Sequence, residues 1–321
     1  MATPQVLPAA RHDLARPGTR GVPSRRRNPR RRDGCAALRY LAPAGIVLLA
    51  LLAYPIYQLV LISFYDYGQP QASGAAPLIF LGLDNYANLL ADKQFWDVLL
   101  ATVVFAGVCV AGSLLVGTAL AVLATRVHPV PRMLLFLAAL GAWATPTIAG
   151  SYVWLFLFDQ DFGLVNEILG ISGHSWTFQR YSAFGLVAAE IIWCSFPFVM
   201  VTMYAGITAI EPQVIEAAAL DGASWRRTAT SVVLPILKPL LMIATIQSII
   251  WDFKVFTQIY VMTNGGGIAG QNLVLNVFAY QKAFAGEQYG FGAAIGVVMT
   301  VLLMLITVLY VRVQRRGAWL P

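Results

Sequence analysis

The sequence predicts an all-α, polytopic membrane protein with six transmembrane helices. Three observations support this fold class: few charges, six long apolar stretches, and a one-sided distribution of lysine and arginine. Of the 321 residues, 58% are hydrophobic and only 12% are charged, whereas a soluble domain carries about 25% charged residues. So few charges cannot cover a water-exposed surface, so most of the surface is expected to face lipid.

The apolar stretches are long enough to cross a bilayer. A helix rises 1.5 Å per residue, so the hydrocarbon core requires about 20 consecutive apolar residues. The predicted spans are residues 41–64, 98–123, 133–158, 184–207, 240–262 and 292–313.

Lysine and arginine predict the orientation, because cytoplasmic loops are enriched in both. Eighteen of them fall on one side of the predicted spans and three on the other. The first set is Arg11, Arg16, Arg20, Arg25, Arg26, Arg27, Arg30, Arg31, Arg32, Arg39, Arg126, Arg132, Arg226, Arg227, Lys238, Arg312, Arg315 and Arg316; the second is Lys93, Arg180 and Lys282. We therefore expect a multi-pass plasma-membrane protein with both termini in the cytoplasm.

The chain divides into a tail, a first helix and a larger membrane domain. Residues 1–38 are rich in Arg, Pro and Gly and predict a disordered basic cytoplasmic tail. This tail either only enforces topology or also binds anionic lipid. Residues 39–95 hold the first helix and an outer loop, residues 96–313 the transmembrane domain, and residues 314–321 the cytoplasmic C-terminus. The net charge of +7 does not predict nucleic-acid binding, because the basic residues form no folded basic face.

The cytoplasmic loop over residues 211–239 has a pattern too regular for a linker. Pro212 suits the start of a helix, residues 214–220 predict one short helix, and Gly222 permits a sharp turn. A second short helix is expected over residues 223–232, limited by Pro235 and Pro239. Small side chains favour docking onto another protein, whereas the Trp225–Arg227 segment equally suits an interfacial helix on lipid headgroups.

Motifs in this loop match the EAA signature. They comprise Glu216, Ala217, Ala218, Asp221, Gly222, Ala223, Leu234 and Pro235. The loop therefore resembles that of ABC importer permeases. The resemblance implies a coupling helix that contacts an ATP-hydrolysing subunit through these residues. Ala229 departs from the aromatic residue common in that family, which puts the packing at the docking groove in doubt.

Further segments extend the resemblance over about residues 40–315. They are Ala189–Trp193, Pro197–Phe198, Ala205–Gly206, Phe256, Ile259–Thr263, Gly265–Gly267, Tyr280, Ala283–Phe284, Gly292–Ile295 and Gly163–Asn166. The flanking pattern is similar to the carbohydrate-uptake branch, including maltose and glycerol-phosphate permeases. The resemblance implies the type I ABC importer transmembrane fold and import of an oligosaccharide, polyol or glycerol phosphate.

The resemblance also implies partners. They are a second, distinct homologous permease, a dimer of nucleotide-binding subunits, and an extracytoplasmic solute-binding protein. The alternatives are an ion-coupled secondary transporter, which predicts repeated halves that the sequence lacks, and a membrane scaffold that does not transport.

The chain lacks the residues that ATP hydrolysis or other catalysis would require. No Gly-Lys pair occurs, so there is no phosphate-binding loop of the G-x-x-x-x-G-K-[ST] type. The three histidines lie in separate predicted segments, and the three cysteines have no metal-ligand spacing. We therefore expect no enzyme activity, no metal and no cofactor on this chain, with ATP and Mg²⁺ held by the partner ATPase.

Polar residues inside the predicted spans are candidates for the solute path, because charged groups there cost at least about 2.5–3.5 kcal/mol. The candidates are Glu190, Trp251, Asp252, Lys254, Phe256, Gln258 and Tyr260. Along one helix, Trp251, Val255 and Gln258 would share a face, and Asp252, Phe256 and Ile259 the neighbouring face. Not all of them are then expected to line one path. The alternative is that Glu190 and Asp252 only hold helices or subunits together.

Overall fold

The computed structural model describes residues 40–317. The first long helix contains the boundary between two units of the chain, which falls between Tyr54 and Pro55. That helix runs from Tyr40 to Ile62 and contains a π-helical turn at Leu49–Ala53 before α2 (Tyr54–Ile62). The predicted tail, residues 1–38, lies outside the described residues, as do residues 318–321.

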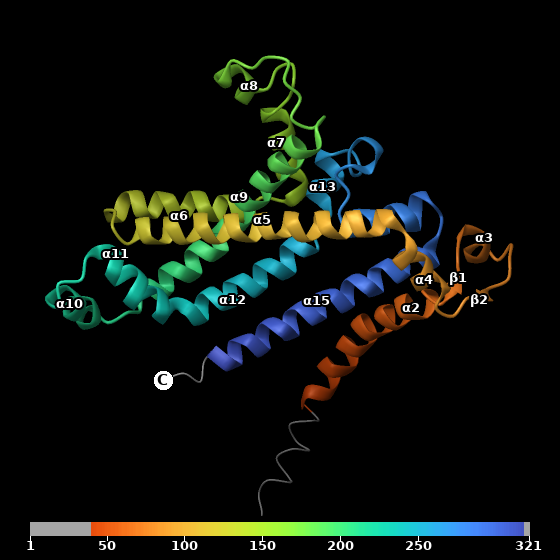
Figure 1. Cartoon of the computed structure of the whole chain (residues 1–321), viewed down its shortest axis with the longest axis horizontal. Coiled ribbons are helices and arrows are strands. Elements are labelled where there is room, and N and C mark those ends of the chain that lie inside the picture. The colour runs from red at the N-terminus through yellow and green to blue at the C-terminus, as the bar shows by residue number, and fades with distance from the viewer. Residues whose placement is uncertain (1–39, 318–321) are drawn as a thin grey trace, which may run out of the picture. The chain divides into compact units, whose positions relative to one another are not determined.

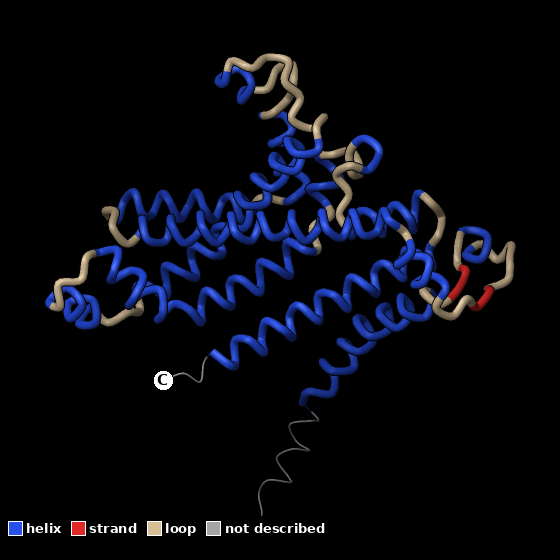
Figure 2. The backbone as a smooth tube through the Cα atoms, in the orientation of Figure 1, coloured by secondary structure: helices blue, strands red, loops and turns tan. Residues whose placement is uncertain are grey.

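The second unit is almost wholly helical (Figures 1 and 2). A two-stranded antiparallel pair, β1 (Tyr65–Asp66) and β2 (Ile79–Phe80), flanks α3 (Gln69–Ala72). The helices that follow are α4 (Asp84–Ala91), α5 (Lys93–Ala124), α6 (Pro129–Ala144), α7 (Thr147–Leu157), α8 (Leu164–Leu169), α9 (Arg180–Thr208), α10 (Pro212–Leu220), α11 (Trp225–Thr228), η2 (Ala229–Val233), α12 (Leu234–Phe253), α13 (Thr257–Met262), η3 (Ile268–Gly270), α14 (Leu275–Tyr280), η4 (Gln281–Ala285) and α15 (Tyr289–Gly317). The predicted all-α class is confirmed.

Five helices in the described range are long and apolar enough to cross a membrane, or six if the bent pair α6–α7 counts as one span. The first, second, fourth and sixth predicted spans correspond to helices Tyr40–Ile62, Lys93–Ala124, Arg180–Thr208 and Tyr289–Val313. The predicted domain boundary at residues 95–96 falls inside α5, because this helix begins at Lys93.

The third predicted span is not one straight helix. The chain bends by 105° between α6 and α7. Thr145 is extended, with ψ 124°, because the ring of Pro146 disfavours helical backbone at the preceding residue. The Thr145 hydroxyl donates to the Gly141 carbonyl at 2.8 Å, which satisfies a carbonyl in the last turn of α6.

The fifth predicted span, residues 240–262, is wrong at both ends. The long helix begins at Trp225 and ends at Phe253, and α13 begins after a break at residues 254–256. Pro235 and Pro239 do not end the helix. The π-helical turn η2 precedes Pro235, and in it the Leu234 amide donates to the Ala229 carbonyl. Such a turn lets the helix continue where its regular backbone hydrogen-bond pattern is interrupted.

The core depends on the close packing of α5 against α9, the most extensive helix pair in the described chain. Gly112 and Gly117 of α5 face Ile192 and Val199 of α9. A Cβ at Gly117 would lie 2.6 Å from the Val199 Cβ and 2.8 Å from the Phe196 carbonyl oxygen. These glycines let the two backbones approach, as small residues do at helix contacts in membranes.

We predict that Gly117→Leu destabilises the protein, because the new side chain has no room between α5 and α9. Overpacking of this kind costs about 1–3 kcal/mol. The measurement is the thermal midpoint of the purified protein in detergent, monitored by loss of monodispersity. Gly107→Leu is the matched control, because nothing lies within 4 Å of a Cβ at that position of α5. Equal midpoints for the two variants would contradict the packing argument.

Candidate functional site

A polar cavity lies where two helices break. It has a volume of about 360 Å³, and we call it the break cavity. Thr145 and Thr147 reach it from the α6–α7 bend, Cys194 and Ser195 from the middle of α9, and residues 251–258 from the break between α12 and α13. Two interrupted helices and one continuous helix therefore form its walls.

Five of the predicted solute-path residues come together in the break cavity. They are Trp251, Asp252, Lys254, Phe256 and Gln258. The expectation that they divide between two helix faces is wrong, because it assumed an unbroken helix. The chain leaves the helical path at Lys254 and at Phe256, whose φ and ψ are −133° and −61°. Unwinding turns side chains from both faces toward one space.

Sequence reasoning missed the opposite wall of the break cavity. Trp143, Thr145 and Thr147 line it, although the third span had yielded no candidate. The Thr145–Pro146 pair could have predicted a break in the third span, because a residue before proline is disfavoured in helical geometry. A bend within a predicted span frees polar groups, and such groups belong beside a cavity rather than lipid.

Asp252 is the strongest polar feature of the break cavity. Its side chain is 3% exposed, and its Oδ2 atom has no hydrogen-bond partner among the described residues. A buried acceptor without a partner is costly. Asp252 lines the break cavity, and a hydroxyl is the kind of donor that pairs with a carboxylate oxygen. The neighbouring Lys254 side chain is exposed and adds a cation to the same lining.

Glu190 lies elsewhere, between α7 and α9. It is fully buried, and its Oε1 atom accepts a 3.0 Å hydrogen bond from the Ser151 hydroxyl. Gly150 leaves room for it, since a Cβ there would lie 3.3 Å from Oε1. Glu190 is not among the residues that line the break cavity. This position favours a role in holding two helices together, and its place on the solute path stays a prediction.

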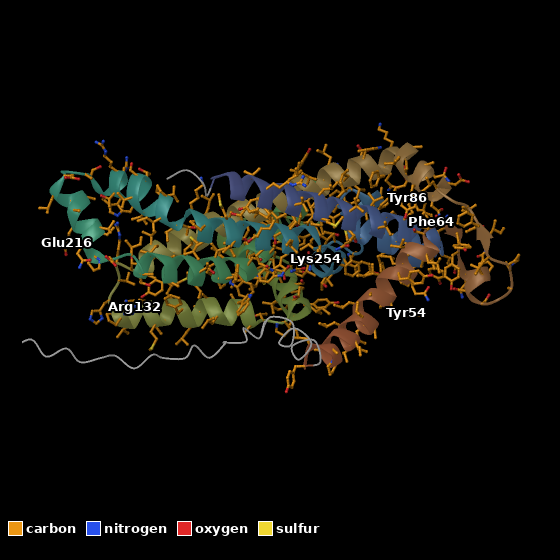
Figure 3. All side chains as sticks on the ribbon, turned by 90° about the horizontal axis from the view of Figure 1, so that it is seen from below. Tyr54, Phe64, Tyr86, Arg132, Glu216 and Lys254 are labelled. Atoms are coloured by element: carbon orange, nitrogen blue, oxygen red, sulfur yellow. The ribbon has the colours of Figure 1, made fainter. Side chains whose placement is uncertain are left out.

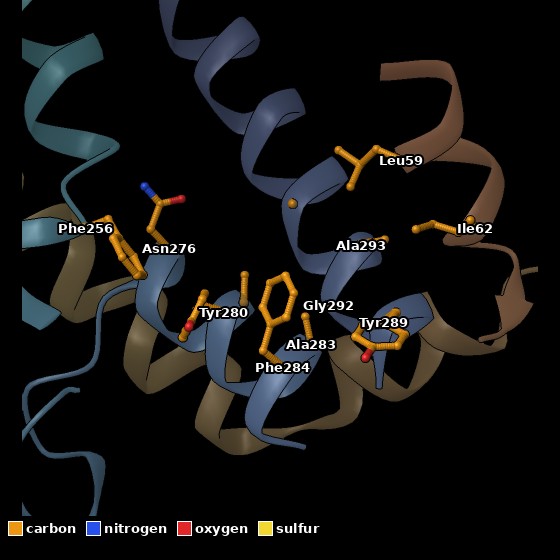
Figure 4. Close-up of a pocket in the computed structure, with 12 residues that line it drawn as sticks. Leu59, Ile62, Phe256, Asn276, Tyr280, Ala283, Phe284, Tyr289, Gly292 and Ala293 are labelled. Carbon is orange, nitrogen blue, oxygen red and sulfur yellow. The ribbon is translucent and has the colours of Figure 1, made fainter. Parts of the chain in front are cut away.

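Tyr260 belongs to an aromatic group beside a second, mostly apolar cavity of about 520 Å³ (Figure 4). Its ring stacks on Phe256 with centroids 5.2 Å apart and meets Tyr280 edge-on at 5.3 Å. Phe256 is the one predicted residue that lines both this cavity and the break cavity. Tyr260 is not among the residues that line the break cavity.

The EAA-type motif lies on an exposed helix–turn unit. The predicted helix over residues 214–220 is confirmed as α10, which carries Glu216. Asp221 follows the helix, and Gly222 makes the turn with φ +72°, a conformation that favours glycine. Glu216, Asp221 and Gly222 are all exposed. The arrangement presents α10 at one end of the long helices (Figures 1 and 3).

A cation–π contact joins this unit to the turn between α5 and α6. The Arg126 guanidinium carbon lies 4.2 Å from the centroid of the Trp225 ring, at the start of α11. In the same segment Ser224 caps α11 by accepting from the Arg227 amide at 3.4 Å. Glu216 and Arg132 lie at the same end of the helices in Figure 3. The α10–α11 segment is thereby in contact with the turn after α5.

Comparison with known proteins gives a consistent result. The family described as "Binding-protein-dependent transport system inner membrane component" matches residues 113–318. The diacetylchitobiose uptake system permease protein DasB of Streptomyces coelicolor is 36% identical over 302 residues, which are 92% of this chain and 91% of that protein. The trehalose/maltose transport system permease protein MalF of Thermococcus litoralis is 34% identical over 74% of this chain and 80% of its own length.

A solved structure matches the fold. A bacterial ABC transporter that imports the acidic polysaccharide alginate aligns with a TM-score of 0.75 at 18% identity, covering 89% of this chain and 96% of that chain. At 18% identity, this alignment shows a similarity of fold.

We predict that Arg126→Ala loosens the α10–α11 unit. A cation–π contact at an exposed site contributes about 0.5–1 kcal/mol, so amide hydrogen exchange over residues 211–228 should become roughly 2–5-fold faster. Arg132→Ala is the control, since no ring lies beneath Arg132 in the described part of the chain. Identical exchange in the two variants would show that the Trp225 contact does not hold the unit.

Proposed function

We propose a solute, an orientation and a set of partners for this chain. The chain belongs to the family of binding-protein-dependent transport system inner membrane components and is a permease subunit of an ABC importer. The solute is a sugar or a sugar-like compound of the oligosaccharide, polyol or glycerol phosphate class. It passes through the break cavity, and ATP hydrolysis on a separate subunit drives its movement.

The observation that carries the proposal is the composition of the break cavity. Tryptophan rings at positions 143 and 251 offer flat apolar faces, while Asp252, Gln258 and the threonines offer hydrogen-bonding groups. A sugar presents hydroxyls around a ring with C–H faces, so it uses both kinds of group. The cavity volume of about 360 Å³ falls within the range of small-molecule sites. The names of the relatives, which include diacetylchitobiose and trehalose/maltose permeases, support the same class.

The exposed helix α10 is proposed to dock on the ATPase subunit, with Glu216, Ala217, Asp221 and Gly222 at the contact. Its short, small side chains allow a partner backbone to approach. ATP and Mg²⁺ belong to that partner. The further partners are a second, distinct permease and an extracytoplasmic solute-binding protein. One solved alginate importer structure supports the last of these partners in kind, since it is described as "in complex with alginate pentasaccharide-bound periplasmic protein".

We propose that both termini are cytoplasmic. This orientation requires an even number of spans, which holds if the α6–α7 pair counts as one. The eighteen-to-three partition of Lys and Arg supports it. The α10 end of the long helices is then the cytoplasmic end, where an ATPase has access to it.

We predict that Asp252→Asn lowers sugar uptake at least about tenfold, because losing a hydrogen bond to a charged group costs about 1.5–3 kcal/mol. Uptake of labelled disaccharide is measured in vesicles that contain equal amounts of the assembled importer. Asp84→Asn is the control, since Asp84 is an exposed carboxylate in α4. If wild-type uptake persists without ATP and stops when an ionophore is added, the protein is an ion-coupled transporter and the proposal fails. If the wild-type protein shows no uptake at all, the result favours a membrane scaffold.

We predict that Gly222→Asp abolishes recovery of the ATPase with the tagged permease in mild detergent. The space around Gly222 is open, so the effect comes from its positive φ and from the added charge. Gly170→Asp is the matched control, because Gly170 also has a positive φ, +65°, and open space around a Cβ but ends α8. Loss of the ATPase with both variants would indicate general misfolding, and loss with neither would remove α10 from the contact.

A further inference from the structure

A third cavity lies at the end of α9 that is remote from α10. It has a volume of about 290 Å³ and is lined by Ser175, Thr177, Phe178, Thr263, Asn264, Gly267 and Ile268. We call it the loop cavity. Residues 175–178 form its first wall and residues 263–268 its second wall. The first wall immediately precedes α9, and α10 follows the other end of this 29-residue helix. At 1.5 Å per residue, the two ends of α9 are about 44 Å apart.

Hydrogen bonds between distant segments build the loop cavity. The Gln271 side-chain amide donates to the Phe178 carbonyl at 2.8 Å, and the Asn272 amide donates to the Arg180 carbonyl at 2.9 Å. Within the second wall, the Thr263 hydroxyl accepts from the Gly266 amide at 3.0 Å. These hydrogen bonds connect the two walls, and a preformed site loses less entropy on binding.

The second wall holds an unusual backbone. Asn264 has φ +50°, and Gly265, Gly266 and Gly267 all have positive φ. A left-handed non-glycine residue is uncommon, and such strain collects at functional sites. A Cβ at Gly267 would lie 2.4 Å from the Asn272 Oδ1 atom. That oxygen is fully buried and has no partner among the described residues.

The groups that line the loop cavity are suited to a neutral polyhydroxylated compound. The side chains of Ser175, Thr177 and Asn264 form no hydrogen bond within the described chain, so their donors and acceptors are available. The Phe178 ring is 63% exposed and offers an apolar face. None of the lining side chains carries a charge. Sugar hydroxyls both donate and accept, as these groups do.

The loop cavity and the break cavity lie at opposite ends of α13. Thr257 and Gln258, at the start of this helix, line the break cavity, and Thr263 and Asn264, just after its end, line the loop cavity. The helix has six residues, which span about 9 Å. A solute that leaves one cavity therefore has the other within a short distance.

We propose that the loop cavity is a sugar-binding subsite that receives a neutral sugar unit before the break cavity does. Thr177, Asn264 and Phe178 make the contacts. That this end faces the incoming solute rests on the orientation given under the proposed function. The binding itself does not depend on that orientation.

The test uses Trp176, which lies between two lining residues and whose indole donates to Asn166 Oδ1 at 2.6 Å. The assembled importer in nanodiscs is titrated with diacetylchitobiose, trehalose and maltose, and tryptophan fluorescence is recorded. Trp176→Phe identifies the part of the signal that comes from this residue. We expect a saturable Trp176 response to at least one of these sugars.

Three variants test the contacts. Thr177→Val removes a hydroxyl at equal volume, Asn264→Gly removes the amide at a position whose φ suits glycine, and Phe178→Leu removes the ring. Each should raise the sugar concentration for half-maximal response at least fivefold. Thr125→Val, at the α10 end of α5, should leave the titration unchanged. Equal thermal midpoints and equal recovery of partner subunits exclude misfolding as the cause.

The outcomes separate the two proposals. If the intact importer takes up labelled sugar but shows no Trp176 response, or if the three variants titrate like wild type, the loop-cavity proposal is overturned and the proposed function stands. If the variants instead weaken binding of the solute-binding protein while the sugar titration is unchanged, the cavity is a protein contact, which also overturns the subsite. If no sugar is taken up while Trp176 responds, the subsite stands and the transport proposal fails.

Discussion

The structure depends on the requirement that a polypeptide in lipid satisfies its backbone polar groups internally. Long helices meet this requirement along their length, and the breaks between them do not. At the first break the Thr145 hydroxyl satisfies the Gly141 carbonyl, and no side chain caps the first turn of α7. At the second break the Asn276 amide donates to the Lys254 carbonyl. Both breaks open onto the same polar cavity, which is where irregular backbone is tolerated in a membrane protein.

The closely packed helices α5 and α9 support the site. Gly112 and Gly117 bring α5 and α9 into close contact, and α9 supplies a continuous wall of the break cavity through Cys194 and Ser195. The interrupted helices α6–α7 and α12–α13 supply the other walls. A continuous helix keeps the cavity in place, while the broken helices turn hydrogen-bonding groups and aromatic rings toward it.

The α10–α11 unit, unlike the packed helices α5 and α9, lies at the surface. It is exposed, has no buried residue in α10, and is joined to the rest of the chain through α9, through α12 and through the Arg126–Trp225 contact. Because one helix runs from Trp225 to Phe253 and includes the π-helical turn η2, a displacement of α10 acts on the same helix that ends in the break cavity. This continuity offers a mechanical route between a docking surface and a solute site.

The sequence by itself determined the all-α membrane class, the approximate position of four spans, the exposed EAA-type helix and the polar residues of the fifth span. These features depend on local properties, namely apolar length, charge bias and short motifs. Only the tertiary structure decided that α6 and α7 bend by 105°, that α12 ends at Phe253, and that residues from two expected faces share one cavity. The physical reason is that breaks and cavities depend on partners distant in sequence. Asn276 lies 22 residues from Lys254, and Gln271 lies 93 residues from Phe178, separations at which no local pattern identifies the partner.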